Sequence, residues 1–467
     1  MPHYISLLFD VEDLCWPESD DITLELANRL TRHQVRGTFF VVAYKARQFA
    51  ERGRTDIVQA LEPHDLASHT TGHSLHPTIA EYLAGADWDD GVMMAMDREG
   101  EGLDILEQVF GRRPTSWGQP GGSWGPQINM AMRRLDMPVV VYPRTRTAPL
   151  ADVHWYAGSL VFPGDALAFF DSALADDEQF EQALKRMDDL LDDRIMKSAC
   201  WSGIFVCHPT RLRAVEFWDA LNFAKGSSTA PQDYRMPTLR SDEAYQTALK
   251  NVDRLIQRLQ SDRRLQIETI QDLSQTFRPP GEMVTYHQID QAMYDITASE
   301  DILLSFYHFS PAELLDLVAR AYTNTGHQID SLYRRMVLGP TADPPPPISH
   351  DDFIYWDDFL SACQMVTRHV SQYARLPASI YLRGAQWSIG TFYRAAMEVW
   401  PLFRAAEQPK YIDWKPGFLY PSVGHEIAVA VQEDYENWPI HRPDVDLNKL
   451  LMHTCFQCWT LRPAYQY

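Results

Sequence analysis

The sequence predicts an α/β domain over residues 1–278, followed by a mainly α-helical accessory domain over residues 279–467. In the first part, short apolar runs alternate with longer amphipathic segments, which is typical of parallel strands joined by crossover helices. Beyond Gly281 the alternation gives way to mostly helical runs. The clearest apolar runs are Ile5–Phe9, Thr38–Val42, Pro138–Tyr142 and Gly203–Cys207.

The segments between these runs carry helical signals. Asp20 and Asp21 can begin a helix that continues to Arg32, because apolar residues then recur at helical spacing. Similar periodicity predicts helices later in the first domain. They span residues 87–110, 180–194 and 249–259, and the strand and helix predicted at 265–273 would close the domain.

Size and charge limit the classes of protein to consider. A chain of 467 residues suggests two or three domains, and a composition of 45% hydrophobic and 22% charged residues is that of a globular protein. The net charge of −21 would repel nucleic acids and anionic membranes. We therefore expect a small-molecule or carbohydrate substrate and no binding to nucleic acids or membranes. The sequence leaves the oligomeric state open.

Cysteine content and the N-terminal segment bear on location. Six cysteines in 467 residues are sparse, which fits reduced thiols. The first predicted strand starts at Tyr4, with no export signal before it, and no later segment is long and apolar enough to span a bilayer. These features predict a cytoplasmic protein.

Three acids end the first apolar run: Asp10, Glu12 and Asp13. In parallel α/β sheets, side chains at the C-terminal ends of strands form the functional site. These acids are therefore the first candidates for a functional site. The alternative is a solvated loop that happens to be acidic.

A histidine-rich stretch follows the second strand and helix. Four histidines, His64, His69, His73 and His76, lie within thirteen residues. His69 and His73 are four apart, so on one helical turn they would face the same way and could bind one divalent cation. Imidazole nitrogens suit zinc, and a carboxylate could complete the set. A pair of hydrogen-bonded loop histidines is the alternative.

Together these motifs resemble those of the polysaccharide deacetylases of carbohydrate esterase family 4. The resemblance rests on Phe9-Asp10-Val11-Glu12-Asp13, on the strand at 37–41, and on the segment from His64 to His73, in this order and spacing. It covers about residues 1–278. It implies a distorted (β/α) barrel and a metal-dependent hydrolase that removes acetyl groups by cleaving non-peptide C–N bonds.

The resemblance also implies roles for individual residues. Asp10 takes the position of the general base, and His69 and His73 take those of the histidine ligands. The acidic ligand of the family directly follows the base, where this chain has Val11. Glu12 and Asp13 both remain candidates for that ligand. His76, which precedes Pro77 as in the family's His-Pro ending, is a lesser candidate for the second histidine.

A glycine-rich loop at 118–125 aligns with the third motif of the family. Gln119 stands where the family has an arginine that orients the base, and a glutamine carries no charge with which to stabilise the Asp10 anion. Trp117 and Trp124 flank this loop, and Trp155 lies near the place of the family's Asp-Trp pair. We consider all three for substrate binding; Trp117 and Trp124 could equally be loop anchors.

The run Gly203–Cys207 ends at His208, as the last motif of the family ends in histidine. The resemblance makes His208 the general acid that protonates the leaving amine. Two other functions stay open. One is a binding or sensor module without turnover, favoured by Gln119; the other is a metal-free amidohydrolase acting on a small amide, although such relatives generally lack the histidine pair.

The second half contains no motif with assignable chemistry. Arg278–Gly281 is a plausible linker, and Pro344–Pro347 separate two helical blocks that hint at related halves. Cys455 and Cys458 have the spacing of metal ligands, but no second pair accompanies them, so buried thiols are the favoured interpretation.

Overall fold

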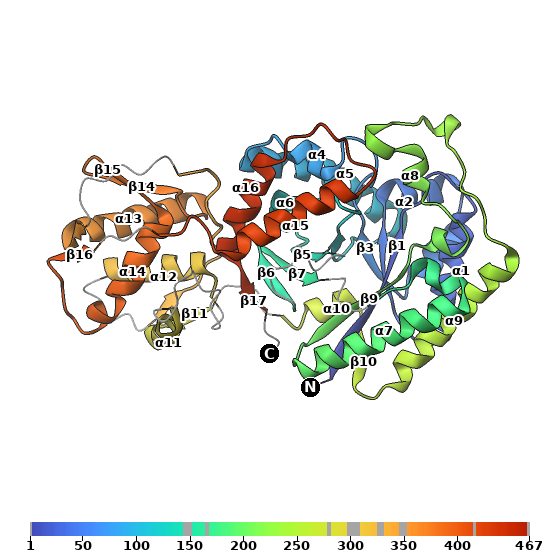
Figure 1. Cartoon of the computed structure of the whole chain (residues 1–467), viewed down its shortest axis with the longest axis horizontal. Coiled ribbons are helices and arrows are strands. Elements are labelled where there is room, and N and C mark those ends of the chain that lie inside the picture. Colours follow the sequence, from blue (N-terminus) through green and yellow to red (C-terminus); the bar gives the residue numbers. More distant parts are fainter. Residues whose placement is uncertain are drawn as a thin grey trace.

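The computed structural model describes residues 2–142, 152–163, 168–277, 282–296, 309–324, 331–344, 353–413 and 417–464. These residues form two lobes, one built around a large sheet and one built of helices with short strand pairs (Figure 1). The predicted linker at 278–281 lies outside the described residues, as do Pro345, Pro346 and Pro347 of the predicted spacer.

Eleven described strands form one curled sheet. Neighbouring strands are parallel except where β6 pairs with β7 and β17. The strand β10 (Leu265–Ile267) pairs with the first residues of β1, beside β2. The remaining strands, in spatial order, are β17 (Arg462–Pro463), β6 (His154–Tyr156), β7 (Ser159–Pro163), β5 (Val139–Tyr142), β4 (Trp117–Gly118), β3 (Asp65–Ser68), β2 (Thr38–Val41), β1 (His3–Val11), β9 (Trp201–Cys207) and β8 (Ala168–Phe169).

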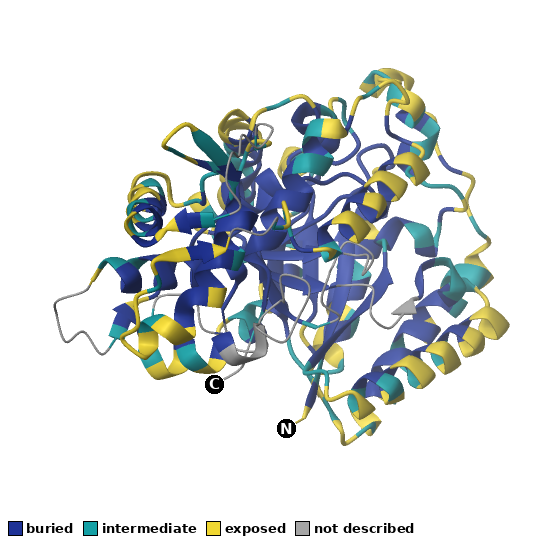
Figure 2. Ribbon diagram, turned by 60° about the vertical axis from the view of Figure 1, so that its left-hand side comes forward, coloured by how far each residue is buried: buried dark blue, intermediate teal, exposed yellow. Residues whose placement is uncertain are grey.

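The strand β1 lies at the centre of the sheet and is buried on both faces. Its odd-numbered residues, such as Leu7 and Phe9, pack into the cluster beneath the outer helices. Leu8 packs instead with Phe40 and Phe205 on the inner face of the curled sheet. Because side chains alternate along a strand, Asp10 belongs to this inner face. Figure 2 shows the sheet as the buried centre of the lobe, with helices exposed around it.

Helices cover the outer face of the sheet. Helix α1, for example, turns Ile22, Leu26 and Leu30 towards the core, as its sequence period predicts. The helices of this lobe are α1 (Ser19–Arg32), α2 (Ala43–Glu51), α3 (Thr55–Leu61), α4 (Ile79–Leu83), α5 (Trp88–Phe110), α6 (Pro126–Arg134), α7 (Asp177–Met196), α8 (Trp218–Asn222), α9 (Asp242–Ser261) and α10 (Ile270–Ser274).

The second lobe has its own core, centred on α12 (Pro311–Thr323). Ser310 caps this helix in a reciprocal arrangement with Glu313, and Pro311 occupies its first turn. The other helices are α11 (Tyr286–Ile296), α13 (Trp356–Tyr373) and α14 (Ile389–Arg404). Antiparallel pairs join β11 (Met283–Thr285) to β12 (Ser331–Tyr333), β13 (Phe353–Tyr355) to β16 (Tyr411–Asp413), and β14 (Ser379–Leu382) to β15 (Ala385–Ser388).

The C-terminal segment, residues 417–464, returns to the first lobe. Helices α15 (Val423–Asn437) and α16 (Asn448–Gln457) pack together, α16 contacts α6, and β17 extends the large sheet by pairing with β6 (Figure 1). The ion pair of Glu313 with Arg462, at 3.4 Å, joins α12 of the second lobe to β17. The division of the chain at residue 278 stays a prediction, and this segment belongs by packing to the sheet before it.

The predicted fold class is confirmed: a distorted, open α/β barrel is followed by a mainly helical domain. The predicted helices at 87–110, 180–194 and 249–259 correspond to α5, to part of α7 and to part of α9. Among the described helices, none combines the length and the apolar character that crossing a membrane requires.

Candidate metal centre and active site

The candidate residues gather at the C-terminal edge of the sheet. Strand β1 ends at Val11, between Asp10 and Glu12, and His69 directly follows β3. His208 directly follows β9, and Gln119 directly follows β4. Because these strands are parallel, their C-terminal ends meet at one edge, so side chains distant in sequence become neighbours.

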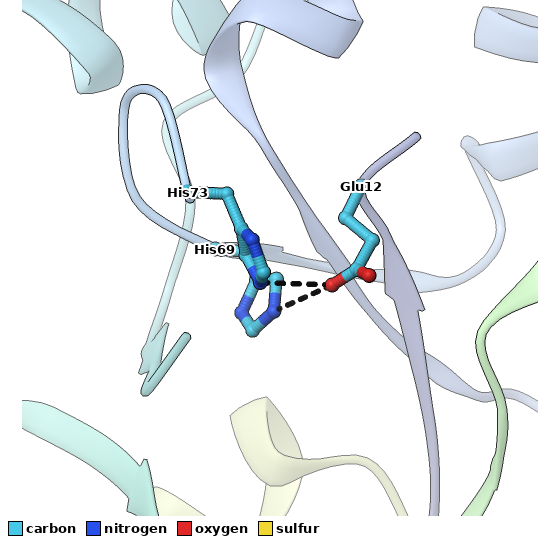
Figure 3. Close-up of side chains that lie close together, drawn as sticks. All are labelled: Glu12, His69 and His73. Atoms are coloured by element: carbon cyan, nitrogen blue, oxygen red, sulfur yellow. Dashed lines mark ion pairs between the residues drawn. The ribbon is translucent and has the colours of Figure 1, made fainter. Parts of the chain in front are cut away.

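Three of these side chains converge on one point: Glu12, His69 and His73 (Figure 3). Oε2 of Glu12 lies 2.9 Å from Nε2 of His73 and 3.5 Å from Nε2 of His69. Within the described residues, these three buried atoms lie against one another, and none of them makes a hydrogen bond of normal geometry. A buried polar atom without a good hydrogen bond costs about 1–3 kcal/mol, so three such atoms at one point indicate a site that a single cation can bind.

The other polar atoms of the same side chains are engaged. Nδ1 of His69 lies 3.2 Å from the carbonyl oxygen of Gly118, and Nδ1 of His73 lies 2.6 Å from Oγ of Ser74. The indole N–H of Trp218 donates to Oε1 of Glu12 at 3.0 Å. Hydrogen bonds on the far side of each side chain thus direct Nε2 of both histidines and Oε2 of Glu12 to the same centre. In metal sites, contacts of this kind orient the ligands.

The donor set fits a divalent cation. Two imidazole nitrogens and one carboxylate oxygen are the ligands of known catalytic zinc sites with three protein ligands. Burial opposes ionisation of Glu12, but His73 and His208 outweigh it and hold the pKa of this carboxyl well below its usual range. Glu12 is therefore an anion at neutral pH, ready to bind a cation.

The two histidines do not share a helical turn, as their spacing had suggested. His69 directly follows β3, and the residues from there to Pro77 form an irregular loop. His73 has a φ of 51°, and its N–H is held by Oγ1 of Thr70 at 2.8 Å. The loop, rather than an i, i+4 helical relation, brings the two rings to a centroid distance of 4.9 Å.

Asp10 lies beside this centre, in a second group with Glu12 and His208. Its Oδ2 is 3.6 Å from Nε2 of His69 and 3.9 Å from Nε2 of His208. Burial raises the pKa of Asp10, while His69 and His208 act against this rise. Asp10 also lines a cavity of about 20 Å³ with Gln119, which is room for one water molecule.

His208 reaches the same centre, with Nε2 3.9 Å from Oδ2 of Asp10 and 3.9 Å from Oε2 of Glu12. Nδ1 of His208 lies 3.3 Å from Oδ1 of Asp171, and Asp171 also pairs with Arg211. Burial lowers the pKa of His208, but Glu12, Asp171 and Asp10 together raise it to about 10. His208 is therefore protonated at neutral pH and can donate a proton.

Asp13 is oriented by a different set of contacts. Its Oδ1 accepts from the backbone N–H groups of Cys15 and Trp16, at 2.8 and 2.9 Å. Its Oδ2 accepts from the hydroxyl of Thr210 at 2.7 Å. Both oxygens are satisfied, and Asp13 is in neither group of converging ligands. It anchors the turn after β1 to the segment after β9.

Gln119 is buried next to Asp10 but does not bond to it. Its amide Nε2 donates to the carbonyl oxygen of Gly121 at 3.0 Å, and its Oε1 has no hydrogen-bond partner. The position that carries an arginine in the resembled family therefore presents no charge and no donor to Asp10.

The three candidate tryptophans are buried side chains. Trp117 is fully buried in β4, and Trp124 packs against Tyr142 and Tyr156 in the same core cluster. Trp155 is buried beneath the guanidinium group of Arg462. Their role in substrate binding stays a prediction, and their burial leaves little ring surface exposed for a substrate to stack on.

His76 and the cysteine pair also lie outside the centre. His76 is held by Glu81 at 2.7 Å and by the carbonyl oxygen of Phe223 at 3.0 Å. Cys455 and Cys458 are buried, and their thiols point to the carbonyl oxygens of Gly424 and Thr454. Within the described residues, neither group is part of a potential metal-binding cluster.

Several residues of the site had no sequence signal. Asp171, Trp218 and Asp219 stand in segments without a motif, and Trp438 comes from the C-terminal segment. The ring of Trp438 meets His73 edge-on, at a centroid distance of 5.7 Å, and covers Gly121. Only tertiary packing brings these residues to the centre.

Residues 2–140 match the family model for polysaccharide deacetylases. The segment contains Asp10, Glu12, His69, His73 and Gln119, but not His208. The resemblance found in the sequence is confirmed over this range; its continuation to about residue 278 stays a prediction. No curated protein matches the chain.

Solved structures with a similar fold are distant. A probable polysaccharide deacetylase from Pseudomonas aeruginosa PAO1 has 15% identity and a TM-score of 0.39, covering 58% of this chain and 89% of that one. PuuE allantoinase has 14% identity and a TM-score of 0.39, covering 58% and 89%. Peptidoglycan deacetylase PdaC from Bacillus subtilis has 16% identity and a TM-score of 0.29, covering 59% and 91%.

Proposed function

We propose, on the premise that residues 2–140 match the polysaccharide deacetylase family model, that the protein is a metal-dependent hydrolase that removes an acetyl or similar acyl group from an N-acylated sugar or related amide. The observation that carries the proposal is the convergence of three buried ligand atoms, on Glu12, His69 and His73, beside Asp10 and His208.

Zinc is the cation that this donor set suits best, with Glu12 rather than Asp13 as the acidic ligand. When bound, such a cation polarises a carbonyl group and lowers the pKa of water. The histidine rings are already held in the required orientation by Gly118 and Ser74, and the Glu12 carboxylate by Trp218.

Asp10 and His208 have complementary roles. Asp10 is an acid whose pKa is raised by burial, so it can accept the proton of the attacking water. In the metal-free protein Glu12, Asp171 and Asp10 raise the pKa of His208, and Asp171, which is not among the proposed ligands, continues to favour the protonated ring that gives a proton to the leaving nitrogen. Asp171 holds Nδ1 of His208 and thereby directs Nε2 to the centre.

Gln119 favours a second candidate, a carbohydrate-binding or sensor module that keeps the cleft and lacks turnover. No charged group at position 119 stabilises the Asp10 carboxylate, and the Gln119 amide donates to Gly121 instead. A module of this kind would bind metal and N-acetylated sugars without hydrolysing them.

The test measures acetate release from N-acetylated mono- and oligosaccharides by the zinc-loaded protein. We expect turnover, and we expect Asp10→Asn to reduce it about 10²- to 10⁴-fold, the range of general acid–base catalysis. Zinc content, measured by elemental analysis, should stay at one ion per chain in this variant because the three proposed ligands, Glu12, His69 and His73, are unchanged.

Asp152→Asn is the matched control, since Asp152 is a carboxylate of the same lobe that bonds to Cys200 and not to the site. Stoichiometric zinc with no acetate release from any substrate would contradict hydrolysis and support the binding module. Absence of zinc would contradict the metal centre itself.

A further inference from the structure

The short helix α8 contributes two consecutive residues to the surroundings of the metal centre. Trp218 donates its indole N–H to Oε1 of Glu12 at 3.0 Å. Asp219 accepts, at Oδ2, the hydroxyl proton of Ser74 at 2.7 Å. Ser74 in turn lies 2.6 Å from Nδ1 of His73. One helix thus reaches two of the three candidate ligands, and it lies outside the segment that matches the family.

The chain of contacts from Asp219 to His73 has a defined direction. The single proton of the Ser74 hydroxyl is given to Asp219, so the Ser74 oxygen can only accept from His73. The proton of a neutral His73 ring therefore resides on Nδ1, and Nε2 keeps its lone pair. Nε2 is the atom that lies 2.9 Å from Oε2 of Glu12.

Little of these three groups is exposed. Ser74 is fully buried, Asp219 is 4% exposed and His73 is 6% exposed. Asp219 is itself fixed, because its Oδ1 accepts from the backbone N–H of Ala220 at 2.7 Å. Bulk water does not reach these groups to replace a lost hydroxyl, so the contacts have no ready substitute.

We propose that Asp219, acting through the hydroxyl of Ser74, is a positioning residue that sets the tautomer and orientation of His73 for metal binding. The inference rests on the proposed metal-dependent function. Trp218 acts in parallel on Glu12, so α8 orients a nitrogen ligand and an oxygen ligand together.

A purely structural role for these contacts predicts a different result. If Ser74 and Asp219 only anchored the histidine loop, their loss would lower the stability of the metal-free fold and leave intrinsic zinc affinity unchanged. If they position His73, zinc affinity falls even in variants whose metal-free fold is intact, because groups behind a metal ligand typically contribute about 10- to 100-fold in affinity.

The experiment measures zinc affinity by competition with a chromophoric chelator, and urea unfolding of the metal-free protein, for four variants. Ser74→Ala removes the relay and Asp219→Asn removes its negative charge. Ser74→Thr keeps the hydroxyl. Ser159→Ala is the matched control, because Ser159 is an equally buried serine whose hydroxyl bonds to the carbonyl oxygen of Asn129.

We expect Ser74→Ala and Asp219→Asn to bind zinc about 10- to 100-fold more weakly, and Ser74→Thr and Ser159→Ala to bind like the wild type. Wild-type affinity in Ser74→Ala, or an equal loss in Ser159→Ala, overturns the inference and leaves the proposed function intact. If the wild-type protein binds no zinc, both the role of Asp219 and the proposed metal-dependent function are wrong. The two failures therefore give different results.

Discussion

At the scale of single residues, three acids within four positions have three different environments. Asp10 and Glu12 lie two apart at the end of β1, so the alternation of a strand places both on the inner face, with Val11 directed outward. Asp13 follows the strand, and its carboxylate accepts hydrogen bonds from the backbone of the next turn. The spacing of the acids, more than their number, separates the proposed base and the proposed ligand from an acid that stabilises the turn.

Glu99 is a buried acid outside the centre whose pKa is raised by burial. It lies in α5, and its Oε2 has no hydrogen-bond partner. Burial raises the pKa of Glu99 from 4.5 to about 7, although Trp117 and Thr71 act against this rise. Between these two pH values the unfolded chain ionises while the folded chain stays protonated, so stability decreases as pH rises.

We therefore expect Glu99→Gln to gain stability relative to the wild type as pH rises from 5 to 8. Each unit of pKa shift corresponds to 1.36 kcal/mol, so the gain approaches about 3 kcal/mol. Urea unfolding of both proteins at pH 5 and pH 8 measures it. The same stability difference at both pH values would mean that Glu99 is not the titrating group.

At the scale of elements, the loop after β4 joins the active site to the C-terminal segment. A Cβ atom on Gly121 would lie 2.3 Å from the indole of Trp438, and one on Gly122 would lie 2.2 Å from the carbonyl oxygen of Asp434. The second contact involves backbone, which cannot rotate away. Glycine at 122 is thus required by the close approach of α15.

Gly122→Ala should destabilise the fold by about 1–3 kcal/mol, the usual cost of overpacking. Gly85→Ala is the control, since a Cβ there meets nothing within 4 Å. Denaturant unfolding compares the two variants. Equal stabilities would show that α15 does not pack on this loop in solution.

At the scale of the whole molecule, the centre draws on segments from both ends of the chain. The candidate ligands lie within residues 12–73. The residues that contact them from behind lie within residues 74–219, and Trp438 belongs to the segment that returns after the second lobe. His73 lies near two tryptophan rings, Trp218 at 5.9 Å and Trp438 at 5.7 Å. Metal binding should therefore be coupled to the stability of the complete fold.

Zinc should raise the thermal unfolding midpoint of the wild-type protein, and a chelator should reverse the increase. A ligand that binds only the folded state contributes about 2.7 kcal/mol at a free concentration of 100 Kd. Asp13→Asn should keep the zinc-dependent increase, whereas Glu12→Gln should lose it. The opposite pattern would identify Asp13 as the ligand. Differential scanning calorimetry with and without zinc measures all three proteins.

Period and motif order are local properties of the chain, so they were enough to predict the strand–helix alternation, the helical second lobe and the candidate residues Asp10, His69, His73 and His208. The sequence could not choose between Glu12 and Asp13, since that choice depends on which oxygens are left unpartnered after folding. It pointed to Trp117, Trp124 and Trp155 as candidates for substrate contact, yet packing buried all three. Asp219 and Trp438 reach the centre only through contacts between remote segments, and no local pattern encodes such contacts.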